Sequence, residues 1–185
     1  KTMTCNRPLA YICLVLNFKG EKPEESGMVF KIQAQNKNGQ FCGTVSQNIA
    51  INAPITTLWK TVGNYTGLAE WVVDVKKTES ISKIKNDFGA VRDITFADNS
   101  HVIECAVGWK DEQYLSYIAT SGLPLDGYHA TISISQKGKS CQVTWESFLI
   151  SQDSEKKKFS EFMEFMDSFY SKSLERLKEK IEKAN

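Results

Sequence analysis

The clearest pattern in the chain is an amphipathic stretch near its C-terminal end, between residues 159 and 181. Charged side chains, mostly glutamate and lysine, occupy one face of this stretch. Apolar side chains recur on the other face at the three- and four-residue steps of an α-helix: Phe159, Phe162, Met163, Met166, Phe169, Tyr170, Leu174, Leu177 and Ile181. The aromatic, Met-rich first half of this face suits a helix that closes a cavity over a sheet, or one that packs as an ordinary core stripe.

The preceding chain alternates apolar and polar residues at the period of β-strands. The pattern predicts strands at residues 41–51, 72–81, 90–96, 102–109, 114–119, 128–135 and 142–150. Two short helical segments come after the first strand, one capped by Asn52 with Pro54 in its first turn and Gly63 at its end, the other around 67–71. This order predicts an α+β fold in which a curved antiparallel β-sheet wraps around a long C-terminal α-helix.

The first 38 residues allow two interpretations. Residues 9–18 and 28–35 both have strand patterns and are separated by a polar loop, which predicts an extra β-hairpin added to the sheet. Alternatively, this segment is an extension that the fold does not need. We therefore divide the chain into an N-terminal extension with a candidate hairpin, residues 1–38, and one main domain, residues 39–185.

Composition narrows the functional classes. With 185 residues and a net charge of +1, the chain predicts neither a nucleic-acid surface nor a polybasic membrane patch. Five scattered cysteines are typical of reduced thiols in a cytosolic protein, and the two histidines lack partners at metal-ligand spacing, so no metal or cofactor is predicted. The longest apolar run, residues 9–16, is too short to span a bilayer as a helix. We expect no integral membrane segment and a cytoplasmic location, with a truncated secretion signal as the alternative.

Short motifs along the chain carry a family resemblance. In order, they are Ala53-Pro54, Leu58-Trp59, Gly67-Leu68 with Trp71, Gly89 with Arg92, Glu104, Tyr117, Tyr128 with Ala130-Thr131-Ile132, and Trp145-Glu146. Their order and spacing resemble the START-like, or SRPBCC, superfamily over about residues 40–185, and most closely its branch of polyketide cyclase/dehydrase and lipid transport proteins. The resemblance implies the helix-grip fold, with an apolar ligand cavity between the sheet and the long helix.

The resemblance also implies roles for individual residues. Arg92 and Glu104 match a charged pair that a synthase branch of the superfamily uses in catalysis. Glu104, Tyr128 and Glu146 match positions that line the ligand pocket of plant hormone receptors on the same scaffold, and Tyr117 matches a position nearby.

Two departures argue against a hormone receptor of that kind. The receptors hold a ligand carboxylate with a lysine, and no cation stands at the matching place near Val73. Their mobile gate is replaced by a tight turn at residues 97–100.

Whether Arg92 meets Glu104 depends on the turn between their strands. Alternation places Arg92 on the inner face with the apolar residues of its strand. A turn of about three residues, with a left-handed residue such as Asn99, sets Glu104 opposite Arg92. A two- or four-residue turn instead faces the alternate set inward: Ile103, Cys105, Val107 and Trp109. Periodicity alone slightly favours this second register, whereas the resemblance favours the first.

Two buried charges would have to pair, because burying either alone is costly. An apolar cavity raises the pKa of a glutamate and a nearby guanidinium lowers it. Glu104 could then move a proton while Arg92 binds a substrate oxygen or a developing anion; the alternative is a structural ion pair that holds the register. Glu146 is a second candidate inward acid, with a solvent-facing position as its alternative.

The remaining candidate ligand-binding residues come from two places. Tyr117 and Tyr128 flank residues 121–127, either as hydroxyls at the cavity rim or as ordinary strand residues, and the loop between them is a candidate lid or a tight turn. The C-terminal helix contributes Phe159, Phe162, Met163 and Met166.

We therefore expect a protein that binds a small hydrophobic molecule, such as a lipid, a polyketide or an isoprenoid-like compound, in an internal cavity. The enzyme alternative is a cofactor-free cyclase, dehydratase or isomerase with Glu104 as general acid/base and Arg92 as its electrostatic partner. A third alternative is an interaction protein with a filled core that contacts a partner through its N-terminal hairpin. The sequence predicts no oligomeric state.

Overall fold

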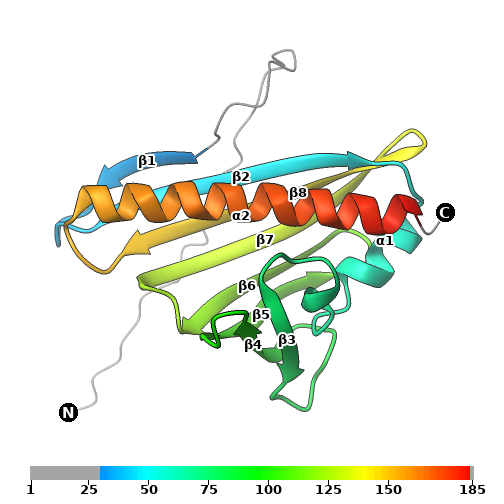
Figure 1. Ribbon diagram of the computed structural model, residues 1–185, viewed down its shortest axis with the longest axis horizontal. Helices are drawn as coiled ribbons and strands as arrows, with labels where there is room; N and C mark the ends of the chain where they lie inside the picture. The colour runs from blue at the N-terminus through cyan, green and yellow to red at the C-terminus, as the bar shows by residue number, and fades with distance from the viewer. Residues whose placement is uncertain (1–29, 184–185) are drawn as a thin grey trace, which may run out of the picture.

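Eight antiparallel strands form one curved sheet in the computed structural model, which describes residues 30–183 (Figure 1). The strands are β1 (Phe30–Gln35), β2 (Phe41–Ile51), β3 (Val75–Ser80), β4 (Val91–Phe96), β5 (His101–Lys110), β6 (Tyr114–Ser121), β7 (Leu125–Lys137) and β8 (Ser140–Ser151). Their order in the sheet is β1-β2-β8-β7-β6-β5-β4-β3, so the chain crosses from β2 to the far edge before it returns strand by strand. The strand predicted at 41–51 and the six consecutive strands predicted between residues 72 and 150 are confirmed.

Three helical segments accompany the sheet: α1 (Ile55–Val62), the 3-10 turn η1 (Leu68–Glu70) and α2 (Lys156–Lys183). Figure 1 shows α2 lying lengthwise across one face of the sheet, along β2 and β8. The amphipathic stripe explains this position, because its apolar face needs the broad surface that a sheet offers. The predicted α+β helix-grip architecture is therefore confirmed.

Several elements start at other residues than predicted, among them β7, which begins three residues earlier at Leu125, and two of the differences have a clear cause. Helix α1 begins at Ile55 with Pro54 as its N-cap, and no side chain caps it. Asn52 lies too far upstream to serve as the cap, and its backbone N–H instead donates to Glu182 Oε1 at 2.9 Å. Strand β3 begins at Val75 and not at residue 72, because Asp74 has a left-handed backbone with φ of 58°. Gly63 ends α1 as predicted.

The core lies between the sheet and α2 and is well packed near both ends of the helix. Near its start, Phe159 stacks on Phe41 with ring centroids 6.4 Å apart. Met163 lies against Gly43, where an added Cβ would stand 2.8 Å from Met163 Cε. Farther along, Leu174, Leu177 and Ile181 are buried. A cavity is therefore expected under the middle of the helix and not under these packed ends.

Strand β1 pairs with β2 as an additional strand of the sheet. The part of the predicted 28–35 strand that the structure describes is thus confirmed from Phe30 onward. The candidate strand at 9–18 lies outside the described residues, and the domain boundary at residue 38 stays a prediction.

Candidate functional site

A cavity of about 370 Å³ lies between the middle of α2 and the β3–β7 half of the sheet. Most of its lining is apolar, with Trp145, Ile94, Met166 and Phe169 among the residues that form it. Several lining residues are exposed to solvent and mark its mouth: Asp74, Ala97, Asp98, Gly122 and Phe165. The site is thus an apolar pocket that opens beside the β4–β5 turn.

Arg92 and Glu104 form an ion pair in the buried wall of this cavity. The guanidinium donates to Glu104 Oε2 through both Nε, at 2.8 Å, and Nη2, at 2.6 Å. Its Nη1 donates to the backbone carbonyl of Tyr65 at 2.8 Å. Arg92 is only 2% exposed and Glu104 6%, so each charge depends on the other for compensation.

The β4–β5 turn explains why the pair forms. Phe96 donates its N–H to Ser100, which leaves a three-residue turn, and Asn99 adopts φ of 64° within it. Arg92 consequently lies opposite Glu104 in the strand register. The register that periodicity favoured, in which Ile103 and every second residue after it face inward, is wrong. The turn geometry and the pairing of two buried charges outweigh the slightly more apolar character of that set of residues.

Aromatic rings enclose the guanidinium on two sides. The Arg92 Cζ atom stands 3.9 Å from the ring centroid of Tyr65 and 4.9 Å from that of Tyr117. Such cation–π contacts stabilise a desolvated guanidinium. Tyr65 belongs to none of the motifs that support the family resemblance. Nothing in the sequence indicated its contact with Arg92, because the two residues are far apart in the chain.

Burial dominates the electrostatics of the site. It raises the pKa of Glu104 above the ordinary value, with the Arg92 guanidinium acting in the opposite direction. For Arg92, burial alone would lower the pKa, but the Glu104 carboxylate raises it above the ordinary value. Burial also raises the pKa values of Tyr117 and Tyr128 well above normal, so both hydroxyls stay protonated at neutral pH.

The two tyrosines predicted near the rim form part of a buried hydroxyl cluster. Tyr128 and Tyr170 share a hydrogen bond of 2.5 Å between their hydroxyls. The Tyr117 hydroxyl accepts the indole N–H of Trp145 at 2.9 Å. Tyr117 and Tyr128 both line the cavity, where their protons and lone pairs are suited to binding a polar group on a ligand.

Other predicted residues lie elsewhere. Glu146 is exposed on the outer face of β8, so its inward orientation is wrong; Trp145 next to it faces the cavity instead. The apolar alternation of Val143, Trp145 and Leu149 already indicated this orientation.

The helix candidates divide between core and cavity. Met166 lines the cavity, whereas Phe159 and Met163 pack in the core near the start of α2, and half-buried Phe162 packs against Phe165 with centroids 6.1 Å apart. The pocket therefore lies under residues 165–169 of the helix and not under its first turns.

The cavity mouth includes residues that the sequence did not single out. Asp98 accepts hydrogen bonds from Ser100 Oγ at 2.6 Å and from the Ser100 N–H at 2.9 Å, and these bonds lower its pKa. Asp74 adds a second carboxylate. Gly122 and Leu123 lie at the mouth in a three-residue turn, residues 122–124, between β6 and β7, so the tight-turn alternative is confirmed, and closure of this turn over the mouth stays a prediction.

Within residues 30–183, no group of three acidic, histidine or cysteine side chains is arranged to hold a metal ion. Over the same residues, no helix is long and apolar enough to cross a bilayer.

A protein-family model described as "Polyketide cyclase / dehydrase and lipid transport" matches residues 43–182. The chain belongs to this family. The match covers β2 through α2, hence both walls of the cavity. It supports a ligand-binding or cyclase type of SRPBCC fold.

Solved structures support the same fold. The protein XoxI from Bacillus cereus is 18% identical with a TM-score of 0.64, covering 75% of this chain and 94% of its own. A protein from Thermobifida fusca is 19% identical with a TM-score of 0.64, covering 75% and 92%. One from Nitrosospira multiformis is 15% identical with a TM-score of 0.63, covering 75% and 95%. At these identities the likeness concerns the fold alone. No curated protein matches the chain by sequence.

Proposed function

We propose that this protein binds a single small hydrophobic molecule in the cavity under the middle of α2. The observation that carries the proposal is an apolar, aromatic cavity of about 370 Å³ with one buried ion pair in its wall. Small-molecule sites typically measure about 300–1,000 Å³ and combine apolar walls with a few polar groups. The volume lies near the lower end of that range, which favours a one-chain or few-ring molecule over a two-chain phospholipid.

The charges around the cavity favour a neutral or cationic ligand. Arg92 is the single cation among the described residues that line the cavity, and Glu104 neutralises it. Asp74 and Asp98 leave two uncompensated carboxylates at the mouth. Lys76 donates to Asn99 on the same turn but does not line the cavity. A ligand carboxylate would therefore meet repulsion at the entrance and no free cation inside.

Glu104 supplies a polar contact for such a ligand. The two hydrogen bonds that Glu104 accepts from the Arg92 guanidinium both go to its Oε2 atom, so its Oε1 atom remains as an acceptor for a ligand. A hydroxyl or amine on an otherwise apolar molecule suits this position, because a donor satisfies a buried carboxylate oxygen. We therefore expect an apolar ligand with at least one hydrogen-bond donor.

Native mass spectrometry followed by solvent extraction tests the proposal first, with a bound small apolar mass as the expected result. Nile red, a neutral dye, then reports whether the purified protein has a free cavity. Val102→Trp should abolish dye binding, because Val102 lines the cavity, whereas Phe148→Trp on the outer face of β8 should not. No bound mass and no dye binding would mean a filled core and would refute the proposal.

Displacement of the dye by matched twelve-carbon molecules tests ligand charge. Dodecanol and dodecylamine should displace the dye at lower concentrations than dodecanoate. Asp98→Asn should narrow that difference by about fivefold, the effect of roughly one close charge in water. Glu146→Gln changes the net charge equally but lies outside the cavity, so it should leave the difference intact.

The ion pair also favours a second candidate function, a cofactor-free cyclase, dehydratase or isomerase. A glutamate with a raised pKa beside a guanidinium can exchange a proton with a substrate while the cation stabilises developing negative charge. Glu104→Gln discriminates the two functions. The Glu104→Gln variant of either a carrier or an enzyme should keep binding the extracted molecule. Only an enzyme would also lose the ability to convert that molecule to a product.

A further inference from the structure

The loop between β3 and β4, residues 81–89, presents apolar side chains to solvent. Ile81 is 56% exposed, Ile84 47% and Phe88 63%. Three large apolar side chains on one nine-residue loop exceed the scattered single exposures that are normal on protein surfaces. The cavity and its ion pair do not account for them, because none of the three lines the cavity.

The polar side chains of the same loop hold its backbone in place. Ser82 Oγ accepts the N–H of Val91 at 2.9 Å. Asn86 Oδ1 accepts the N–H of Tyr65 at 3.0 Å, and the Asp87 carboxylate accepts the N–H of Phe88 at 2.7 Å. The first two bonds anchor the loop to β4 and to the segment after α1, and the third fixes the backbone within the loop, so the outward position of the apolar side chains is built into its conformation.

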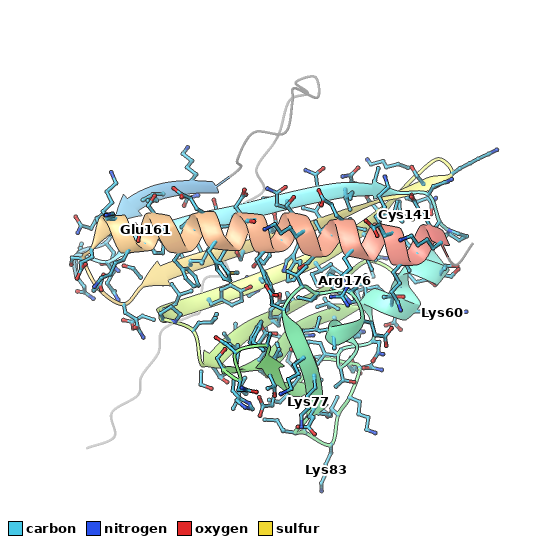
Figure 2. All side chains as sticks on the ribbon, in the orientation of Figure 1. Lys60, Lys77, Lys83, Cys141, Glu161 and Arg176 are labelled. Carbon is cyan, nitrogen blue, oxygen red and sulfur yellow. The ribbon has the colours of Figure 1, made fainter. Side chains whose placement is uncertain are left out.

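Lysines alternate with the exposed apolar residues. Lys83 and Lys85 lie within the loop and are exposed. Figure 2 shows Lys83 at the outer tip of this part of the molecule, on the side away from α2, and Lys77 between that tip and α2. The loop itself, residues 81–89, contains these two lysines and one acidic residue, Asp87, which is a local excess of one positive charge.

We propose that the β3–β4 loop docks the protein on an anionic lipid bilayer. Exposed Ile and Phe side chains can enter the headgroup boundary, and adjacent lysines attract anionic lipid. A protruding tip fits a deformable lipid surface. A protein partner is less suitable, because lysine is depleted from the buried centres of protein interfaces and here it separates the apolar side chains.

This inference does not depend on the cavity holding a ligand. In the β3–β4 pairing, Val75 and Phe96 at the mouth form one end and Ser80 and Arg92 form the other, from which the loop extends. Docking through the loop would thus leave the cavity mouth away from the lipid. The net charge of +1 predicted no basic membrane patch. That total conceals the local excess of positive charge on this loop, because basic and acidic residues nearly cancel over the whole chain.

Co-sedimentation of the full chain with vesicles tests the proposal. We expect binding to phosphatidylcholine vesicles containing phosphatidylglycerol, weaker binding in high salt, and little binding to pure phosphatidylcholine. Lys83→Glu with Lys85→Glu should weaken binding by at least about 30-fold, since losing each lysine near an anionic surface costs about fivefold and the new carboxylates add repulsion. Lys137→Glu with Lys139→Glu, in the exposed β7–β8 turn that carries no large exposed apolar side chain, is the matched control and should change binding little.

Phe88→Trp tests insertion separately. Its emission should shift to the blue on anionic vesicles and be quenched by brominated lipid, relative to the wild-type protein. Equal losses of vesicle binding for the two double-lysine variants would overturn the assignment to this loop. Wild-type binding that does not depend on the phosphatidylglycerol content of the vesicles would overturn it as well. A lysine effect without any emission shift would overturn insertion of the apolar side chains and leave electrostatic attraction to the lipid surface alone.

Discussion

Replacing Glu104 by Gln should destabilise the protein by about 3 kcal/mol. The change removes the charge partner of Arg92, a guanidinium that is 2% exposed and has no second carboxylate among its described contacts. Breaking a buried pair by removing one partner costs about 3–5 kcal/mol. The lower end applies here, because the Tyr65 carbonyl and the faces of Tyr65 and Tyr117 still stabilise the cation.

A double-mutant cycle built from Arg92→Met, Glu104→Leu and the double variant isolates the pair. Replacing both partners with apolar residues of similar size, Arg92→Met with Glu104→Leu, should bring stability back to within about 1 kcal/mol of the wild type, because neither charge then remains unpaired. Urea unfolding measures each variant. With an m-value of about 2 kcal/mol/M, Glu104→Gln should lower the midpoint by about 1.5 M. Glu79→Gln breaks the exposed Lys77–Glu79 pair and should change stability by less than about 0.5 kcal/mol. Additive losses for the single variants Arg92→Met and Glu104→Leu would refute a buried, coupled pair.

Two further substitutions test the packing around the cavity. Gly122→Ala at the mouth should cost at least about 3 kcal/mol, because φ is +94° and the new Cβ would stand 2.0 Å from the His101 carbonyl oxygen. Gly138→Ala, with φ of +61° and open space around the new Cβ, should cost about 1 kcal/mol. Thermal unfolding compares the two variants, and equal losses of stability would contradict the close approach at the mouth. Tyr170→Phe should cost about 1–2 kcal/mol because it leaves the Tyr128 hydroxyl without its buried partner, and adding Tyr128→Phe should cost little more. Fully additive losses in urea unfolding would contradict a shared hydrogen bond.

The secondary structure was largely predictable because its determinants are local. Alternation identified the strands, and a three- and four-residue stripe identified α2, whose apolar face could be buried only against a sheet of this breadth. Those same periods predicted that Arg92 faces inward, since its neighbours at every second position are apolar. They also indicated the inward face of β8, although Glu146 on its outer face remained a candidate.

The tertiary structure decided which inward-facing side chains meet. Whether Glu104 faces Arg92 depended on one residue more or less in the β4–β5 turn, a difference that reverses the face of a whole strand. The position of the cavity along α2 depended on packing across the sheet, where Met163 fills the space over Gly43 and leaves none at that end. Periodicity specifies which face of an element is buried, whereas the depth of a pocket and the partner of a charge depend on contacts between residues far apart in the chain.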